Sequence, residues 1–310
     1  MKKPIRYGLF LLMTIFIINL VVILLVNIIF RHWQIFTGAN LSIIIFSSLL
    51  ASLIISVIVI YTSPVIKDFL ITYRTLLRLE ALSHPLLMRL SSEAPGTYNH
   101  SLIVANLANR AAKAIGADSL LARVGGYYHD SGKLSNPLAF IENQAGTDNI
   151  HEEIDNPQKS AKTIINHVKA GVKLAKEYKL PDEVIALIAE HHGTTLLTYF
   201  YEKARGKNPQ TIRGSFRYPG PKVMSREAAI LMLADAIEAK IRLIKEVNPK
   251  IIHDVVDEII QMRLNDKQLE LSGLSNGDIT RIKDSFMDTL GVIFHQRIDY
   301  PKTGLLRYKI

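Results

Sequence analysis

Two long uncharged segments near the N-terminus limit what this chain can fold into more than any other feature. Tyr7–Phe30 and Leu41–Ile60 are 24 and 20 residues long, and neither contains a charged side chain. An α-helix rises about 1.5 Å per residue, so each segment is long enough to cross a hydrocarbon layer about 30 Å thick. The first is also too long for the apolar part of a signal peptide. Neither shows the polar face expected of a helix packed on a protein core. We therefore predict a two-helix transmembrane hairpin over residues 1–63.

The basic residues around these segments indicate how the hairpin is oriented. Three precede the first segment, one lies in the connector 31–40 and three follow the second segment: Lys2, Lys3, Arg6, Arg31, Lys67, Arg74 and Arg78. Because basic residues stay preferentially on the cytoplasmic side of a bilayer, both chain ends are expected in the cytoplasm. The sequence thus predicts a multi-pass protein of the cell membrane, with the lipid bilayer as one partner.

Residues 64–90 are expected to form an amphipathic helical linker. Its apolar side chains recur at steps of three and four residues: Ile66, Phe69, Leu70, Tyr73, Leu76 and Leu77. The linker could pair with that of a second copy, although two or three heptads are too few to define a coiled coil. Ser48, Ser52 and Ser56 of the second segment either let two helices approach closely or are simply tolerated there. A homodimer through the transmembrane and linker helices is therefore one interpretation.

The net charge of the chain has a topological explanation. There are 37 Lys and Arg against 28 Asp and Glu, a balance of +9, which by itself would suggest a nucleic-acid partner. More than half of this excess lies in residues 1–80, around the predicted hairpin. No nucleic-acid-binding motif accompanies the remainder, so a nucleic-acid polymer is not expected as a partner. The chain contains no cysteine, which excludes disulfide scaffolds, thiolate metal sites and cysteine nucleophiles.

Residues 91–310 have the pattern of an all-α domain. Helical segments with recognisable starts or stops are expected over 97–115, 118–130, 157–179, 182–192, 226–246, 249–264 and 276–295. The N-caps are Asp118, Asn156 (with a proline after it) and Ser225, and Gly116 marks a stop. Convincing alternation with period two is missing, so no sheet is needed. The segments 131–156 and 202–223 are expected to be long irregular loops, which are often functional.

The candidate site consists of seven histidine and aspartate side chains, one of which lies in a strongly apolar predicted helix. Each histidine or aspartate alone could be a satisfied core residue or a helix cap. Together they are seven inward-placed ligand types on five predicted helices: His100, His129, Asp130, His167, His191, His192 and Asp235. Asp235 interrupts a strongly apolar run, which is a poor place for a carboxylate unless it is paired or binds a metal.

These ligand types predict a centre of two divalent metal ions. Imidazole and carboxylate without thiolate suit iron, manganese, zinc or similar cations. Seven ligands exceed the needs of one tetrahedral ion, so two ions sharing Asp130 are the more economical interpretation. Such a pair would hold a hydroxide ready to attack a phosphorus atom while neutralising the phosphoryl oxygens.

The order of these residues resembles the HD-domain phosphohydrolases, in the multi-histidine version that binds two metals. The surrounding motifs are similar to the membrane-anchored PgpH-type enzymes over about Ser83 to Pro301: Glu93–Ser101, Leu121–Gly125, Tyr127–Lys133, Glu142–Gln144, Phe216–Lys222 and Leu233–Asp235. The resemblance implies an all-α HD domain in the cytoplasm over residues 91–310. It also implies hydrolysis of cyclic di-AMP, a bacterial second messenger, to linear pApA by a di-iron or di-manganese centre.

The resemblance implies roles for individual residues as well. The seven residues above would be the metal ligands, with Asp130 bridging the two ions and Lys133 meeting the scissile phosphate or the leaving group. Asp130 and Lys133 are thus the predicted catalytic residues. The chain departs from the family pattern at its N-terminus, where two predicted spans replace a seven-span domain and its extracytoplasmic sensory region. This departure puts the family's sensory input in doubt.

A basic loop follows the paired histidines directly. No acid occurs between Glu202 and Glu227, whereas seven basic residues do. The loop is therefore expected to meet phosphates through Arg217 and Lys222, as Lys133 would, and Tyr218 or Phe216 could stack on a base. The alternative is an exposed loop that its charges keep soluble.

Two other functions stay open at this point. One is an HD hydrolase of another phosphate ester, either cyclic di-GMP or a nucleotide. The cyclic di-GMP branch typically has a Gly-Tyr-Pro element soon after its paired histidines, whereas here Gly193–Leu196 reads Gly-Thr-Thr-Leu. The other is a non-catalytic membrane receptor that binds a nucleotide, although such receptors usually lose ligands and this chain keeps all seven.

Overall fold

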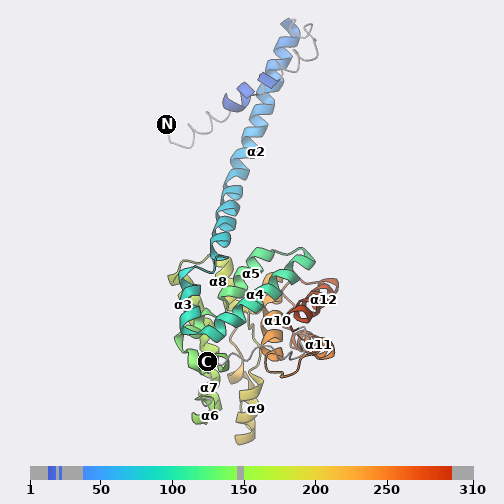
Figure 1. Ribbon diagram of the computed structural model, residues 1–310. Coiled ribbons are helices and arrows are strands. Elements are labelled where there is room, and N and C mark those ends of the chain that lie inside the picture. The colour runs from blue at the N-terminus through green and yellow to red at the C-terminus, as the bar shows by residue number, and fades with distance from the viewer. Residues whose placement is uncertain (1–12, 19–20, 23–37, 145–149, 295–310) are drawn as a thin grey trace, which may run out of the picture. The chain divides into compact units, whose positions relative to one another are not determined.

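A computed structural model describes residues 13–18, 21–22, 38–144 and 150–294. The chain divides into two compact units, Met1–Arg74 and Thr75–Ile310. Helix α2, Gly38–Leu79, is one continuous helix of 42 residues that begins in the first unit and ends in the second (Figure 1). It contains the second apolar segment and continues through Pro64, where we had expected the linker to begin.

The first predicted membrane segment lies largely outside the described residues, which show helix at 13–18 and 21–22. Across the part of the chain that the structure describes, we find no helix that combines the length and the apolar character needed to cross a membrane.

The second unit is all-α, as the sequence predicts. Its longer helices are α3 (Pro85–Glu93), α4 (Pro95–Ile115), α5 (Ser119–Tyr128), α7 (Pro157–Glu177), α8 (Asp182–Glu190), α9 (Thr198–Lys207), α10 (Arg226–Ile241), α11 (Pro249–Asn265) and α12 (Asn276–Ile293). The short helix α6 spans Ile150–Glu153, and single 3-10 turns lie at η2 (Ser131–Ser135), η3 (Pro137–Ala139), η4 (Ile141–Asn143) and η5 (Arg213–Phe216). Among the described residues, extended pairing is limited to one isolated antiparallel bridge, between Leu196 and Arg217.

Local capping chemistry explains where most of these helices begin. The side chains of Asp118, Asn156 and Ser225 accept hydrogen bonds from the first free backbone N–H groups of α5, α7 and α10, as predicted. Gly116 ends α4 with φ of 66°, a left-handed conformation that glycine adopts without a steric penalty.

The structure differs from the expected elements in three places. Helix α10 ends at Ile241, five residues before the predicted end. Helix α9 occupies Thr198–Lys207, so the segment 202–223 is partly helical rather than a loop throughout. Residues 131–143 form three successive 3-10 turns within the segment 131–156 that we expected to be irregular.

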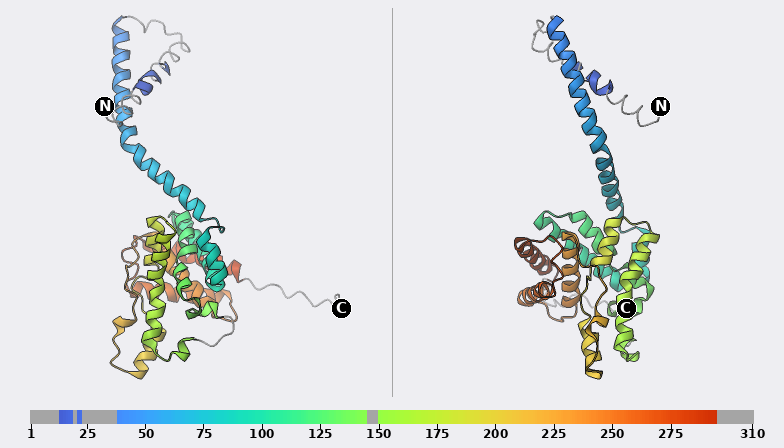
Figure 2. Two further views of the ribbon diagram at one scale, coloured as in Figure 1. Left: turned by 90° about the vertical axis from the view of Figure 1, so that its left-hand side faces the viewer. Right: turned by 180° about the vertical axis from the view of Figure 1, so that it is seen from behind.

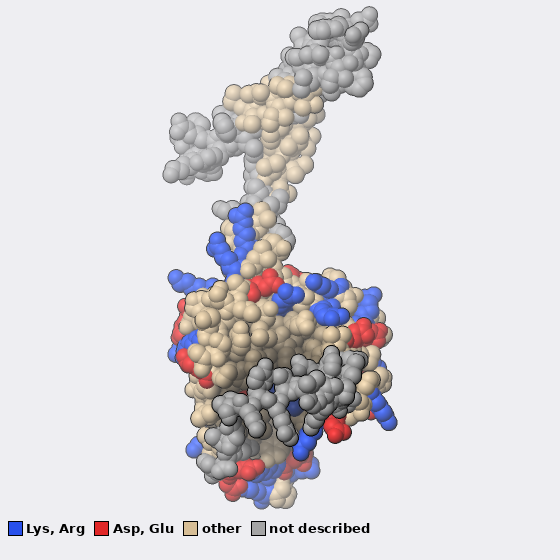
Figure 3. Space-filling view, viewed as in Figure 1, with Lys and Arg blue, Asp and Glu red and all other residues tan. Residues whose placement is uncertain are grey.

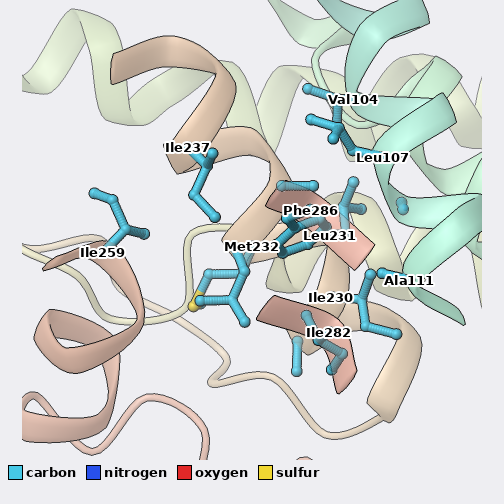
Figure 4. Packing of buried hydrophobic residues seen from close by; sticks show 14 of the residues in the cluster. Val104, Leu107, Ala111, Ile230, Leu231, Met232, Ile237, Ile259, Ile282 and Phe286 are labelled. Carbon is cyan, nitrogen blue, oxygen red and sulfur yellow. The ribbon is translucent and has the colours of Figure 1, made fainter. Parts of the chain in front are cut away.

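Helix α10 is the centre of the main hydrophobic core. It packs against α4, α5, α8 and α11, and α12 packs against α4 and α11; α11 and α12 lie side by side in the right-hand view of Figure 2. Figure 4 shows Ile230, Leu231 and Met232 of α10 among side chains from α4, α11 and α12. Eight apolar residues of α10 are completely buried, so Asp235 projects from a helix whose buried side chains are mostly apolar. This packing holds α10 in place for the site.

Candidate metal centre

The seven predicted ligands converge into two adjacent groups. One contains Asp130, His167, His191 and His192, and the other contains His100, His129, Asp130 and Asp235; within each group the ligand atoms all lie within 4.8 Å of one another. The residues come from α4, the end of α5, α7, the end of α8 and α10. Six of the seven are buried, and His192 is partly exposed.

Asp130 is the residue that the two groups share, and its two oxygens face different groups. Oδ1 lies 3.3 Å from Nε2 of His167 and 3.8 Å from Nε2 of His191. Oδ2 lies 3.3 Å from Nε2 of His129 and 3.5 Å from Nε2 of His100. A carboxylate in this position can give one oxygen to each of two cations.

Three histidines are oriented by the same backbone contact. Nδ1 of His129, His167 and His191 lies 2.8, 2.6 and 2.8 Å from the carbonyl oxygen three residues earlier. A carbonyl only accepts, so each Nδ1 carries the proton and each Nε2 is left with a lone pair that points into the cluster. His129 directly follows the last residue of α5, and His191 directly follows the last residue of α8. When the rings are neutral, the local fold therefore presents three Nε2 lone pairs to one point.

The distances between the ligand atoms fit divalent metal ions. Nε2 of His167 and Nε2 of His191 are 3.2 Å apart, and when both rings are neutral with the proton on Nδ1 their facing lone pairs repel each other unless a cation lies near both. For bonds of about 2.1 Å, neighbouring ligands of one ion are separated by roughly 3.0–3.4 Å. Among the described residues, Nε2 of His129 and both oxygens of Asp130 are buried without a hydrogen bond of normal geometry. The buried cluster could thus hold divalent metal ions.

The protonation equilibria of the cluster reflect its burial and its carboxylates. Burial would raise the pKa of Asp130, but Lys133 and the surrounding imidazoles hold it well below its ordinary value. Burial would lower the pKa of His129, but Asp130 and Asp235 raise it to about 10. Burial and the neighbouring rings of His129 and His167 lower the pKa of His191 to about 3. Both carboxylates of the cluster are therefore ionised near neutral pH, as metal ligands must be.

Glu238 belongs to the same buried network, although we did not predict it. It contacts Nδ1 of His100, while Nε2 of that ring lies 3.1 Å from Oδ1 of Asp235. The side chain of Glu238 is only 2% exposed. Its spacing of three residues from Asp235 on an apolar helix was the available signal, because residues three apart share one helix face.

Lys133 lies beside the cluster, between two carboxylates. Its Nζ is 2.7 Å from Oδ2 of Asp130 and donates a hydrogen bond of 2.5 Å to Oε1 of Glu142. Glu142 is held in turn by the hydroxyl of Thr97, which donates to its Oε1 over 3.2 Å. The turn η4, which contains Glu142, approaches the start of α4 closely at Gly96: a Cβ atom on Gly96 would lie 1.8 Å from the carbonyl oxygen of Glu142.

The predicted substrate-binding residues of the basic loop divide into two sets. Tyr218 is buried against the cluster, with its ring centroid 4.2 Å from that of His192. Arg217 instead forms two hydrogen bonds with Asp266, of 2.6 and 3.0 Å, and a third with the carbonyl of Thr194. Lys222 donates to the carbonyl oxygen of Lys267 over 2.8 Å. The structure thus brings Tyr218 to the cluster and engages the other two side chains elsewhere.

Comparison with known proteins agrees with this geometry. Residues 97–240 match the family model of the HD domain. Cyclic-di-AMP phosphodiesterase PgpH of Bacillus subtilis (strain 168) is 40% identical over 304 residues, which cover 97% of this chain and 42% of that protein. The protein of the same name from Listeria monocytogenes serotype 1/2a (strain 10403S) is 42% identical over 232 residues, 75% of this chain and 32% of that protein. This chain therefore spans less than half the length of either relative.

A solved structure is also similar to this chain. The crystal structure of the L. monocytogenes PgpH HD domain in complex with cyclic-di-AMP is similar with a TM-score of 0.67 and 41% sequence identity, over 69% of this chain and 100% of that one.

Proposed function

Because this chain belongs to the HD-domain family, we propose that it is a metal-dependent phosphodiesterase that hydrolyses cyclic di-AMP to linear pApA. One observation carries the proposal: six imidazole and carboxylate groups meet around a seventh, Asp130, whose two oxygens face two ligand groups. The similar L. monocytogenes HD domain, solved in complex with cyclic-di-AMP, supports the choice of substrate. The seven residues are then the ligands of two ions, and iron or manganese suits their nitrogen and oxygen donors.

The residues around the cluster have separate tasks in this reaction. Two bound divalent ions would lower the pKa of water and neutralise phosphoryl oxygens. Asp130 positions both ligand groups relative to each other, and the backbone carbonyls behind His129, His167 and His191 fix the direction of each ring. Lys133, which Glu142 holds 2.7 Å from Asp130, supplies a fixed positive charge for a phosphate or a leaving oxygen.

The second part of the proposal is that the N-terminal segments anchor the enzyme in the bacterial cell membrane, with both chain ends in the cytoplasm. The N-terminal half of α2 has no charged residue, and Figure 3 shows its described surface without charge. Large apolar side chains are exposed on it, among them Phe46 at 70%, Leu53 at 51% and Ile58 at 54%. Ser52 and Ser56 are buried within the single chain, which fits close helix packing in the hairpin.

Turnover by the full chain tests the catalytic proposal. We expect detergent-purified protein loaded with Mn²⁺ or Fe²⁺ to linearise cyclic di-AMP, and to prefer it to cyclic di-GMP. His129→Ala and Asp130→Ala should abolish turnover, because each removes a buried group of the cluster. His253→Ala is the matched control, since its side chain is 52% exposed on α11. Full activity of Asp130→Ala, or turnover of cyclic di-GMP alone, would contradict the proposal.

Cell fractionation tests the anchoring. The full chain should sediment with membranes, remain there in high salt and be released only by detergent. Recovery in the supernatant without detergent would refute a transmembrane anchor and leave the catalytic proposal intact.

A further inference from the structure

One arginine beside the cluster has no acidic partner of its own. Arg263 lies in the last turn of α11, and its Nε is buried without a hydrogen bond in the described part of the chain. Its guanidinium has one recorded contact, 3.8 Å from Nη1 to the sulfur of Met262, a weak acceptor. The residue as a whole is partly buried, so Nε is the donor that water does not reach, and leaving such a donor unpaired is costly unless a ligand satisfies it.

The carboxylates near Arg263 are already occupied. Asp266 accepts two hydrogen bonds from Arg217 and another from Gln268, over 3.0 Å. Asp235 is surrounded by imidazoles, with Nε2 of His100 at 3.1 Å and Nδ1 of His192 at 3.5 Å. Arg263 is close enough to both aspartates and to Tyr218 for electrostatic interaction, yet it bonds to neither carboxylate among the described contacts.

Arg263 also borders a pocket next to the cluster. The pocket has a volume of about 610 Å³, and its lining combines Leu196, Met262 and three arginines, Arg213, Arg217 and Arg263, with two acids, Glu258 and Asp266. This volume is within the range of small-molecule sites. The segment 194–196 and Arg217 connect it to the cluster, because Tyr218 donates its N–H to the carbonyl of Thr195 and its ring stacks on His192.

We propose that Arg263 binds the phosphate of the cyclic dinucleotide that is not being cleaved, while the other phosphate lies at the cluster. The inference rests on the proposed function. The guanidinium offers the planar pair of N–H donors that matches two phosphate oxygens. Leu196 and Met262 supply apolar surface for an attached nucleoside, and Arg213 adds positive charge at the rim. Arg263 therefore takes the role that the sequence suggested for Arg217 and Lys222.

This role predicts an effect on substrate binding rather than on chemistry. The charge of the uncleaved phosphate does not change during the reaction, so Arg263 stabilises the bound substrate and the transition state equally. Loss of uniform binding raises KM and leaves kcat nearly constant. A hydrogen-bonded contact to a charged group corresponds to about a ten- to hundredfold change in affinity.

The experiment compares steady-state hydrolysis of cyclic di-AMP by the full chain and three variants. Arg263→Gln should raise KM about ten- to hundredfold, with kcat within about threefold of the parent, and Arg263→Lys should raise KM less because it keeps the charge. Arg110→Gln, which removes an exposed arginine of α4, should leave both constants unchanged. Metal content and the far-ultraviolet circular dichroism of each variant are measured in parallel.

The outcomes separate the two proposals. If the parent and Arg110→Gln do not hydrolyse cyclic di-AMP, the proposed function fails and this inference fails with it. If both turn over the substrate and Arg263→Gln keeps the parental KM, the inference alone is wrong. Loss of bound metal from a folded Arg263→Gln variant, with reduced kcat, would also overturn it, because Arg263 would then act by supporting Asp235.

Discussion

Glu238 offers a sharp test of how the metal centre is held. Nδ1 of His129, His167 and His191 lies against a neutral backbone carbonyl, whereas Nδ1 of His100 contacts the carboxylate of Glu238. A carboxylate partner makes an imidazole more basic and fixes its direction. We therefore expect Glu238→Gln to weaken the group that contains His100, and to spare the group of His167, His191 and His192.

The size of the effect follows from the contact that is lost. Glutamine has the shape of glutamate and still accepts the proton of Nδ1 through its amide oxygen, so that burial and packing are kept. What disappears is the negative charge behind the ring. Removing such a partner costs about 10- to 100-fold in metal affinity, or roughly 1.4–2.7 kcal/mol. This change falls on one of the two sites.

The assay counts and titrates bound metal. The parent protein should hold two Mn²⁺ ions per chain, and Glu238→Gln should retain one tightly while the other dissociates at about 10- to 100-fold higher free metal concentration. Glu258→Gln is the matched control, because that glutamate is exposed on α11 and pairs with Lys240. Two tightly bound ions in Glu238→Gln, with unchanged affinities, would refute the role of Glu238. Equal weakening of both ions would show that it supports the fold of the whole cluster instead.

Four further predictions concern stability. Gly132→Ala should lower the free energy of unfolding by at least about 2 kcal/mol, because a Cβ there would lie 1.8 Å from the carbonyl oxygen of His167. Gly206→Ala, where no atom lies within 4 Å, should raise it by about 0.5–1 kcal/mol in thermal melts. Lys133→Met should lower the free energy of unfolding by about 3–5 kcal/mol in urea titrations of protein stripped of metal by a chelator, and adding Glu142→Gln to that variant should restore part of the loss. Effects of the two substitutions that simply add would contradict a buried Lys133–Glu142 ion pair. EDTA should lower Tm of the parent, because the free energy of unfolding falls by about 2.7 kcal/mol if metal had been at 100 times its Kd, and should not change Tm of Asp130→Ala.

Helix starts could be predicted from the sequence because their signals are local. Asp118, Asn156 and Ser225 each cap the helix that follows, and a cap depends only on the next three residues. The end of α10 at Ile241 has no such signal, since neither glycine nor proline follows before Pro249. Helix α9 gave no clear signal for a related reason: it is polar and Ala204 is its only buried residue, so its sequence lacks the apolar periodicity of a packed helix.

The sequence predicted the ligands of the candidate site but not the residues around them, such as Glu238 and Arg263. The seven ligand types stand out because imidazole and carboxylate groups are unusual on apolar helix faces. Arg263 has no comparable signal, since a basic residue in the last turn of a helix ordinarily interacts with the helix end. Arg217 was expected to bind a phosphate and instead binds the carboxylate of Asp266. Asp266 is 49 residues away in the sequence and comes close only in the fold. Such pairings depend on tertiary contacts that a single sequence does not show.

Two helices end at the metal centre, and this has an electrostatic consequence. His129 follows α5 and His191 follows α8, so both C-terminal ends face the same few ångströms. The aligned peptide dipoles of a helix place about half a negative charge at that end. Unlike the charges of Asp130 and Asp235, this contribution belongs to the backbone and has no proton to gain. The electrostatic attraction of the two helix ends for a cation therefore persists at low pH. A side-chain substitution does not remove it as long as both helices remain folded.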